Sequence, residues 1–299
     1  MACAASAALT SNNDVPFPVV ETMCTSSLRN RHIVSTTELS DNIYVMKKLV
    51  SLSVMACLVL LAFVSCKHEE DDRVILNAVT DYDGNSYDAI RIGKQVWMKS
   101  NLRTTHFRDG KAIPSPEGEV PWSNDKSYVY EPQAFEVPGY DPNIYGLYYN
   151  WPAVSNAHGV CPKGWHVPSD AEWKELSDYV SSVGKYTYFG VPENIAKALA
   201  STTGWAESDE GGTPGYHPEA NDATGFSAFP AGTYNGPIGS NNGATHGDWN
   251  VGANFWSSTE YEGVGNFAWY FSLGYSGAGV DNWYCPKNYG YSVRCLRDM

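Results

Sequence analysis

The residues whose chemistry is clearest lie near the end of the chain, in residues 255–297. This stretch is rich in Tyr, Gly, Ser, Asn and Asp, and it also contains Trp269 and Trp283. A globular core does not use this mixture, whereas binding surfaces do. Tyr and Trp give large rigid contact areas, and Ser, Gly and Asn give adaptable hydrogen bonds. The composition therefore predicts noncovalent recognition, with residues 261–291 as the contact segment.

Sequence patterns that indicate catalysis or a bound cofactor are absent. The histidines lack the His-Glu-x-x-His spacing, and neither a Gly-x-Ser-x-Gly motif nor a Walker-type loop occurs. Asp281 and Asn282 alone offer few oxygen ligands for calcium. We therefore expect no metal, no cofactor and no enzymatic activity. His166, beside Trp165, is interpreted as a buried structural histidine.

Strand patterns occur at both ends of residues 255–297. Phe255 and Trp256 are bulky residues that suit a half-buried pleated surface. Residues 291–295 alternate between larger apolar side chains and Ser292 or Arg294. This period of two predicts a final strand with one buried face and one solvent face, and it places Arg294 on the solvent face.

Two helices are predicted in the middle of the chain. Ser169 and Glu172 have the spacing of a capping box, and the apolar residues that follow recur at helical intervals. We expect a helix over residues 170–182 that buries Trp173, Leu176 and Val180. A second helix is expected after Pro192, with its apolar side formed by Ile195, Ala198 and Leu199, and it should end before Gly204.

The remaining segments indicate short strands and long loops. Residues 81–98 contain an Asp-Gly turn and alternating apolar residues, the pattern of a β-meander. Residues 104–145 contain six prolines, which exclude long regular elements. An order of strands, then two helices, then strands favours the α+β class over a parallel α/β sheet.

The N-terminal part indicates export. Residues 1–45 have no periodic pattern and are interpreted as disordered or as an extension outside the native protein, with translation starting at Met46. Residues 46–65 have the basic start, apolar run and small terminal residue of a signal peptide. Because Cys66 follows directly, the segment resembles a lipoprotein signal in which Cys66 carries the lipid, although Phe63 stands where Leu is usual. An uncleaved N-terminal anchor is the alternative.

Residues 66–76 form a charged segment that cannot fold alone, and we expect the folded domain over residues 77–299. Acidic residues after a lipidated cysteine resemble an export signal to the outer surface in Bacteroides-type bacteria; a solvated linker is the plain alternative. The net charge of -13 argues against nucleic acid as a partner. We therefore expect an outer-membrane lipoprotein on the cell surface, with membrane contact through its lipid alone.

Three cysteines remain in the folded part, Cys161, Cys285 and Cys295. In an oxidising compartment pairing is expected. A bridge from Cys161 to Cys295 would enclose nearly the whole core and constrain the unfolded chain strongly. A bridge from Cys285 to Cys295 is the alternative. The cysteine left over would be a reactive thiol or an incidental residue of a variable stretch.

Five stretches in order resemble a known family. They are residues 92–102 with Gly93-Lys94-Gln95-Val96-Trp97-Met98, residues 145–151, residues 161–173 with Cys161-Pro162-Lys163-Gly164-Trp165-His166, residues 256–260 and residues 292–297. Together they resemble the Fibrobacter succinogenes major paralogous domain, from about residue 79 to the end. The resemblance implies an exported lipoprotein with a C-type-lectin-like fold: two helices, short antiparallel strands and long irregular loops. It also implies the disulfide between Cys161 and Cys295.

The tail is also similar to the variable segment of retroelement-diversified proteins, in which a C-type-lectin-like scaffold presents exchangeable residues. A glycine-rich lectin-like loop is the plainer interpretation. On the diversified interpretation the ligand-contacting positions are Tyr261, Asn266, Tyr275, Ser276, Asp281, Asn282, Trp283, Tyr284, Asn288 and Tyr289.

Two functions from different classes follow. The first is a surface-anchored module that binds an extracellular protein or glycan; stacking of a sugar on Trp269, Trp283 or Tyr284 is one form of it. The Glu-Pro-Asn and Trp-Asn-Asp triplets of calcium-dependent lectins are absent. The second is an enzyme or accessory protein that acts on extracellular polysaccharide. The related sulfatase-modifying oxidases need two active-site cysteines close in sequence, whereas Cys285 and Cys295 are ten positions apart.

Overall fold

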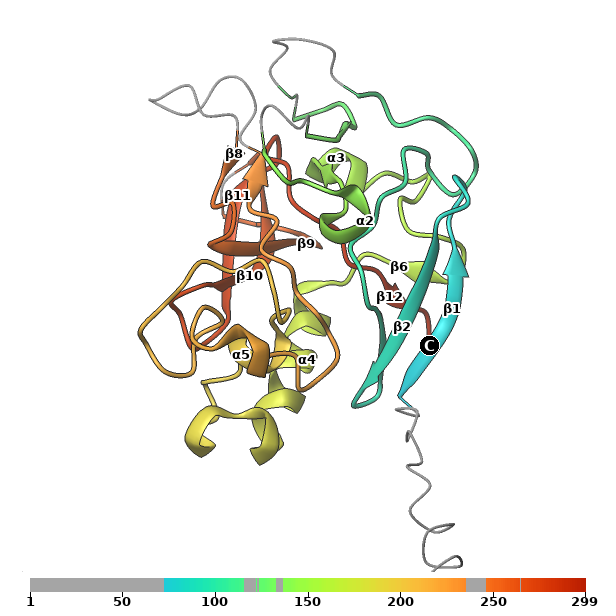
Figure 1. The fold of residues 1–299 in the computed structure, drawn as a ribbon. Coiled ribbons are helices and arrows are strands. Elements are labelled where there is room, and N and C mark those ends of the chain that lie inside the picture. Colours follow the sequence, from blue (N-terminus) through green and yellow to red (C-terminus); the bar gives the residue numbers. More distant parts are fainter. Residues whose placement is uncertain (1–72, 116–121, 123, 133–136, 235–245, 264) are drawn as a thin grey trace, which may run out of the picture. The chain divides into compact units, whose positions relative to one another are not determined.

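The computed structural model describes residues 73–115, 122, 124–132, 137–234, 246–263 and 265–299 (Figure 1). Four α-helices and antiparallel sheets form this part of the chain, which confirms the α+β class. The predictions for residues 1–45, the signal peptide at 46–65 and the lipidated Cys66 lie outside the described residues. So does the charged segment up to residue 72. The first strand begins at Val74, three residues before the expected start of the domain.

Strands of the described residues form four sheets: a five-stranded sheet in the order β1-β2-β3-β12-β6, a three-stranded sheet in the order β11-β10-β9, and the pairs β4-β5 and β7-β8. The strands are β1 (Val74–Thr80), β2 (Ser86–Ile92), β3 (Gln95–Met98), β4 (Val129–Tyr130), β5 (Tyr148–Tyr149), β6 (Trp165–His166), β7 (Thr233–Tyr234), β8 (His246–Gly247), β9 (Gly252–Glu260), β10 (Phe267–Gly274), β11 (Asp281–Pro286) and β12 (Leu296–Arg297). The α-helices are α2 (Pro142–Tyr145), α3 (Trp151–Val154), α4 (Asp170–Ser182) and α5 (Ala196–Leu199), and the 3-10 helices are η1 (Gly184–Tyr186), η2 (Tyr188–Gly190) and η3 (Pro218–Ala220).

The predicted meander is confirmed as β1, β2 and β3. The turn between β1 and β2 is held by Asp81, whose carboxylate accepts hydrogen bonds from the Asn85 amide at 2.9 Å and the Tyr87 hydroxyl at 2.6 Å. Asp81 is buried, and these donors satisfy its oxygens. The turn between β2 and β3 contains Gly93 at φ +61°, where an added Cβ would lie 2.9 Å from the Tyr179 ring.

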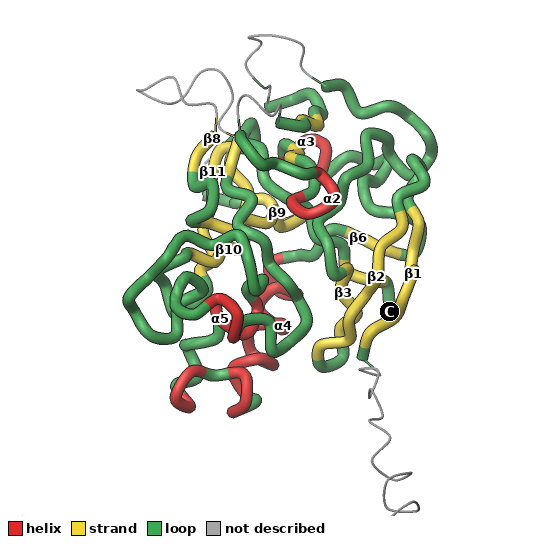
Figure 2. The backbone as a smooth tube through the Cα atoms, viewed as in Figure 1, coloured by secondary structure: helices red, strands yellow, loops and turns green. Residues whose placement is uncertain are grey.

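Helix α4 has the predicted bounds and the predicted capping box, with both reciprocal hydrogen bonds between Ser169 and Glu172 present. It contacts β2 of one sheet and β9 and β10 of the other, and Figure 2 shows it beside β10. The Trp173 ring stacks on Phe271 of β10 at 4.5 Å. Helix α4 therefore packs against both sheets through the face that the spacing of its apolar residues predicts.

The second predicted helix is α5, a single turn with Ile195 at its N-cap and Ala198 and Leu199 buried. The two other α-helices, α2 and α3, were missed by the sequence analysis. Each is one turn long, begins at a Pro-containing first turn and is capped by a side chain, Asp141 in α2 and Asn150 in α3. Elements of this length carry too few residues to show a helical period.

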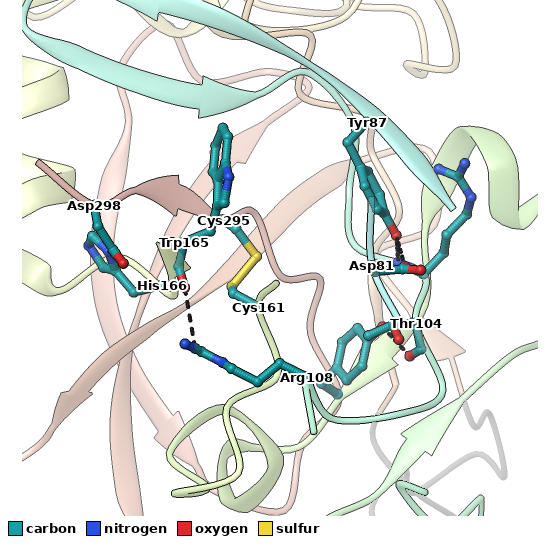
Figure 3. The surroundings of a disulfide bond; sticks show 11 residues. Asp81, Tyr87, Thr104, Arg108, Cys161, Trp165, His166, Cys295 and Asp298 are labelled. Atoms are coloured by element: carbon teal, nitrogen blue, oxygen red, sulfur yellow. Dashed lines mark hydrogen bonds and ion pairs between the residues drawn. A yellow bond between two sulfur atoms is a disulfide. The ribbon is translucent and has the colours of Figure 1, made fainter. Parts of the chain in front are cut away.

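The disulfide joins Cys161 to Cys295, as the long-bridge prediction and the family resemblance both expected (Figure 3). It ties the segment before α4 to the segment that leads into β12. The alternative bridge from Cys285 to Cys295 is wrong: Cys285 is a free, buried thiol in β11. Burial raises the pKa of that thiol well above its ordinary value, which disfavours the reactive thiolate. Cys285 is therefore a core residue and not an incidental one.

The prediction of a solvent face for residues 291–295 is wrong. All five side chains are buried, and Arg294 is 0% exposed. Its guanidinium donates to Asn101 Oδ1 at 2.6 Å, to the Phe226 carbonyl at 2.5 Å and to the Met98 carbonyl at 3.1 Å. The Arg294 guanidinium also lies 4.6 Å from the centre of the Phe226 ring. Both faces of this segment are covered by protein. The alternation therefore separates polar side chains from larger apolar ones inside the core, and it does not separate a solvent face from a buried face.

Candidate ligand-binding surface

The contact segment predicted from composition contains β10 and β11, which form a three-stranded sheet with β9, and β11 is an edge strand of this sheet. In the register, Trp269 pairs with Tyr284 and Tyr270 pairs with Trp283. Successive side chains of a strand point to opposite faces of its sheet. Trp283 and Tyr284 are both exposed, at 57% and 41%, but they therefore lie on opposite faces.

One face carries four aromatic residues that we call the aromatic cluster: Tyr261, Phe267, Trp269 and Tyr284. The rings of Tyr261 and Tyr284 stack with centroids 3.9 Å apart and an interplanar angle of 14°. Trp269 meets both rings edge-on, at 5.4 Å and 5.8 Å. Phe267 meets Tyr284 edge-on at 5.9 Å. None of the four is buried, so the cluster is an organised aromatic surface in contact with solvent.

The loop before β10 supports this cluster. An added Cβ at Gly263 would lie 2.6 Å from the Tyr261 ring, so a larger residue at this position would displace that ring. The backbone amide of Tyr261 donates to the Phe267 carbonyl at 3.1 Å, which ties Tyr261 to the start of β10. A hydrogen bond with Tyr284 raises the pKa of Tyr261 and fixes the pair further.

The opposite face of the sheet is mostly interior. Tyr270 lies 4.7 Å from Tyr291, and the Tyr291 ring lies 4.8 Å from Trp256. Cys285 is buried on the same face. Trp283 is exposed at the outer edge of this face because β11 has no further strand beside it. Trp283 is thus separated by the sheet from the aromatic cluster.

Asn282 joins β11 to the start of α4. Its side-chain amide donates to Asp170 Oδ1 at 2.5 Å. Asp170 is the first residue of α4, and partial burial raises the pKa of its carboxyl. Asp281, one residue earlier, is exposed. Asn282 therefore has a structural partner, and Asp281 is the acidic residue of this strand that is free to meet solvent.

Tyr275 and Ser276 lie far from the aromatic cluster. They occupy the connection between β10 and β11 at the end opposite Asn266, and the eight residues of β10 span about 25 Å. Tyr275 is half-buried against the core that contains α4, and its carbonyl accepts from Gly215 at 2.9 Å. Ser276 is exposed.

The turn after β11 holds Asn288 and Tyr289, both half-buried. Tyr289 meets Tyr291 edge-on at 6.5 Å and packs against the core. Lys287 forms an ion pair with Glu260 and lies 4.5 Å above the Trp151 ring. Its backbone donates to the carbonyl of the exposed Asn266 at 2.8 Å. This turn is fixed to the scaffold on several sides.

Of the ten predicted ligand-contacting residues, only Tyr261 and Tyr284 belong to the aromatic cluster. The sequence analysis named Trp269 as a sugar-stacking candidate but left it out of the ten ligand-contacting positions, and it overlooked Phe267. A sequence signal was available for both. Phe267 and Trp269 are two positions apart, and side chains at that spacing in a strand lie on one face.

His166 is half-buried and lies between two carboxylates. Its Nδ1 is 2.6 Å from Asp298 Oδ1, and its Nε2 is 2.9 Å from Glu172 Oε1 (Figure 3 shows the Asp298 side). Carboxylates only accept hydrogen bonds, so the ring satisfies both when each nitrogen carries a proton. His166 thus links the first turn of α4 to the residues after β12. Its contacts agree with the structural interpretation, although it is more exposed than expected.

Partial burial by itself would raise the pKa of the Glu172 carboxyl. Hydrogen bonds from Ser169 and His166 outweigh burial and hold that pKa below its ordinary value of 4.5. A depressed folded-state pKa contributes stability that is present above pH 4.5 and is lost as the pH falls through the folded pKa.

We expect Glu172→Gln to lower the free energy of unfolding at neutral pH by about 1 kcal/mol, because the charge near the helix N-terminus is lost. The free energy of unfolding of the Glu172→Gln variant should also fall less steeply than that of the wild type as the pH decreases below 4.5. Urea unfolding at several pH values measures both effects. Glu175→Gln, in the same helix, is the control. If the free energy of unfolding fell equally steeply with decreasing pH in the wild type and in Glu172→Gln, the lowered pKa assigned to Glu172 would be contradicted.

Within the described ranges, no group of three His, Cys, Asp or Glu side chains is placed to hold a metal ion. Nor does any helix in the described part of the chain have the length and apolarity to cross a membrane.

These observations define an α+β domain with a disulfide-linked scaffold and an exposed aromatic surface. A model of the Fibrobacter succinogenes major domain matches residues 90–297. The chain belongs to this family, which confirms the resemblance drawn from its motifs. No curated protein and no solved structure matches the chain.

Proposed function

We propose that this chain is a surface-anchored lipoprotein whose C-terminal segment binds an extracellular protein or glycan. The aromatic cluster carries the proposal. Its Tyr284 ring is exposed and its other three rings are half-buried. The rings contact one another, and three of the four are mounted on the paired strands β10 and β11, so they lose little conformational freedom on binding. Aromatic side chains of this kind contribute most of the binding energy at many interfaces, and their flat faces also suit stacking on sugar rings.

The scaffold of this binding module is proposed to be C-type-lectin-like. Support comes from the α+β class, from the predicted two-helix region in the middle of the chain, and from the disulfide that links the segment before α4 to the last strand. Long irregular connections, including residues 200–232, carry few regular elements.

The proposal extends to a retroelement-diversified tail. Its support is the exposure of six of the ten predicted positions: Asn266, Ser276, Asp281, Asn282, Trp283 and Tyr284. The half-buried Tyr275 and Tyr289 contact the core, so they tolerate exchange less well. A truncated copy of the tail-coding sequence beside a reverse transcriptase gene would support diversification.

Export and anchoring are proposed from the sequence of residues 46–76. The signal-like segment, Cys66 and the following acidic residues support lipidation and display on the outer surface. The binding surface would then face the surroundings of the cell.

The test is binding of the purified folded domain to an array of glycans and extracellular proteins. Tyr284→Ala removes the ring that contacts the three others of the aromatic cluster. We expect it to weaken binding about 10- to 30-fold with little effect on thermal stability, because the side chain is exposed.

Phe189→Ala is the matched control, since it removes an exposed aromatic ring from η2, outside residues 261–291. The binding of this control should stay close to wild type. If Trp283→Ala abolished binding and Tyr284→Ala did not, the ligand would bind the face that carries Trp283, and the assignment to the aromatic cluster would be wrong. Release of soluble products from a polysaccharide would favour the alternative, an enzyme or accessory protein.

A further inference from the structure

A pocket of about 290 Å³ lies where the β2–β3 turn, the first turns of α4 and the residues after β12 meet. It contains none of the ten predicted ligand-contacting residues and no member of the aromatic cluster. Its volume is just below the range of roughly 300–1,000 Å³ for small-molecule sites. It therefore suits a ligand of about one sugar ring.

Three cationic side chains line this pocket, Arg91, Lys94 and Arg297. All three are exposed, and none makes a side-chain hydrogen bond or ion pair within the described residues. The chain as a whole carries a net charge of -13. The lining also holds three carboxylates, Glu172, Glu175 and Asp298, so its formal side-chain charge is balanced within a strongly acidic chain. Because the three cationic side chains are themselves unpaired, they are able to bind an anionic group at this position.

The carboxylates of the pocket are mostly engaged. Glu172 accepts from Ser169 and His166, and Asp298 accepts from His166. An ionised carboxylate has about four acceptor positions, so both retain capacity for hydroxyl donors. Glu175 is the remaining carboxylate in the lining, and it has no partner among the described residues. The lining thus combines free cations with fixed acceptors.

The pocket also has an apolar part. Val96 and Leu296 line it, and each is buried except for a small accessible area. An acidic sugar matches these features together. Its carboxylate or sulfate would contact the cations, its hydroxyls would donate to Glu172 and Asp298, and a face of its ring would cover the apolar side chains.

We propose that this pocket is a second binding site, independent of the aromatic cluster, for the charged residue of an acidic glycan. The cations supply charge-assisted hydrogen bonds to the anionic group, and the fixed carboxylates select a ligand that also carries hydroxyl groups. A bare anion such as phosphate satisfies the cations but leaves the acceptors without partners.

The test is titration of the full chain with galacturonic acid, galactose and inorganic phosphate, followed by calorimetry or by chemical shifts. Galacturonic acid should bind saturably and galactose should not. Lys94→Gln and Arg297→Gln should each weaken binding by about tenfold. Glu175→Gln should strengthen it, because the unpaired like charge is removed. Lys185→Gln is the charge-matched control outside the pocket, and it should have no effect.

Tyr284→Ala should leave galacturonic acid binding unchanged, so failure of the pocket and failure of the aromatic cluster can be told apart. Equal affinity for phosphate would overturn the assignment to an acidic sugar. Absence of saturable binding, or binding that Lys94→Gln and Arg297→Gln leave unaltered, would overturn the site itself.

Discussion

Replacing Cys161 and Cys295 together by alanine is expected to lower the free energy of unfolding by about 4–5 kcal/mol. The bridge closes a loop with a sequence separation of 134 residues, and the entropy that it removes from the unfolded chain grows with the logarithm of that length. Since domains of this kind are stable by about 5–15 kcal/mol, the loss is a large share of the total. Chemical denaturation of the oxidised protein and the double variant measures it.

Cys285→Ala is the matched control, because it removes a buried sulfur that is not bridged. Its cost should be limited to the lost packing of one small side chain, about 1 kcal/mol. The reduced wild type should resemble the double variant. If reduction or the double substitution left the unfolding midpoint unchanged, the bridge would contribute little to stability, and its role would have to lie elsewhere.

Sequence reasoning succeeded where the signal is local. The bounds of α4 follow from Ser169, Glu172 and three apolar residues at helical spacing, all within twelve positions. The β1–β2 hairpin follows from a turn signal and its flanks. In both cases the residues that specify the element are neighbours in sequence, so nothing distant had to be known.

The candidate ligand-binding surface was predicted only in part, because amino-acid composition does not reveal how strands pair or in which register. Exposed aromatic residues were expected in residues 261–291, and Trp283 and Tyr284 are exposed. Their separation onto two faces depends on β11 being a strand paired with β10. The position of Tyr275 likewise depends on where β10 ends. A composition rich in Tyr and Gly gives no strand boundaries, so these residues were grouped as one surface.

Arg294 shows the same limit in the interior. Alternation in residues 291–295 indicates two faces, but it does not say what covers each face. The covering comes from residues 98–101 and from residues 226–227, which are far away in sequence. A charged residue in a strand is usually exposed. Here buried oxygen atoms of Met98, Asn101 and Phe226 accept hydrogen bonds from the guanidinium, so Arg294 is enclosed in the core.

Arg294→Met is accordingly expected to be among the most destabilising single substitutions, with a loss of about 3–5 kcal/mol. Met fills much of the volume but donates no hydrogen bond. It would leave Asn101 Oδ1 and the carbonyls of Phe226 and Met98 without their donor in a buried site. Each unsatisfied buried acceptor costs about 1–3 kcal/mol. Urea unfolding of the variant and the wild type measures the difference.

Arg294→Lys tests whether charge alone is sufficient. Burial lowers the pKa of Arg294 to about 9, and the charged form is retained at neutral pH with support from Asp222. Lysine keeps the charge but lacks the planar fork that reaches acceptors on several sides and packs between the Phe226 and Phe255 rings. It should therefore recover less than half of the loss. Arg297→Gln, an exposed arginine of β12, should change stability by less than about 0.5 kcal/mol. An Arg294→Met variant as stable as Arg297→Gln would contradict this expectation. It would mean that the hydrogen bonds of the guanidinium only offset the cost of desolvating its charge and contribute nothing net to stability.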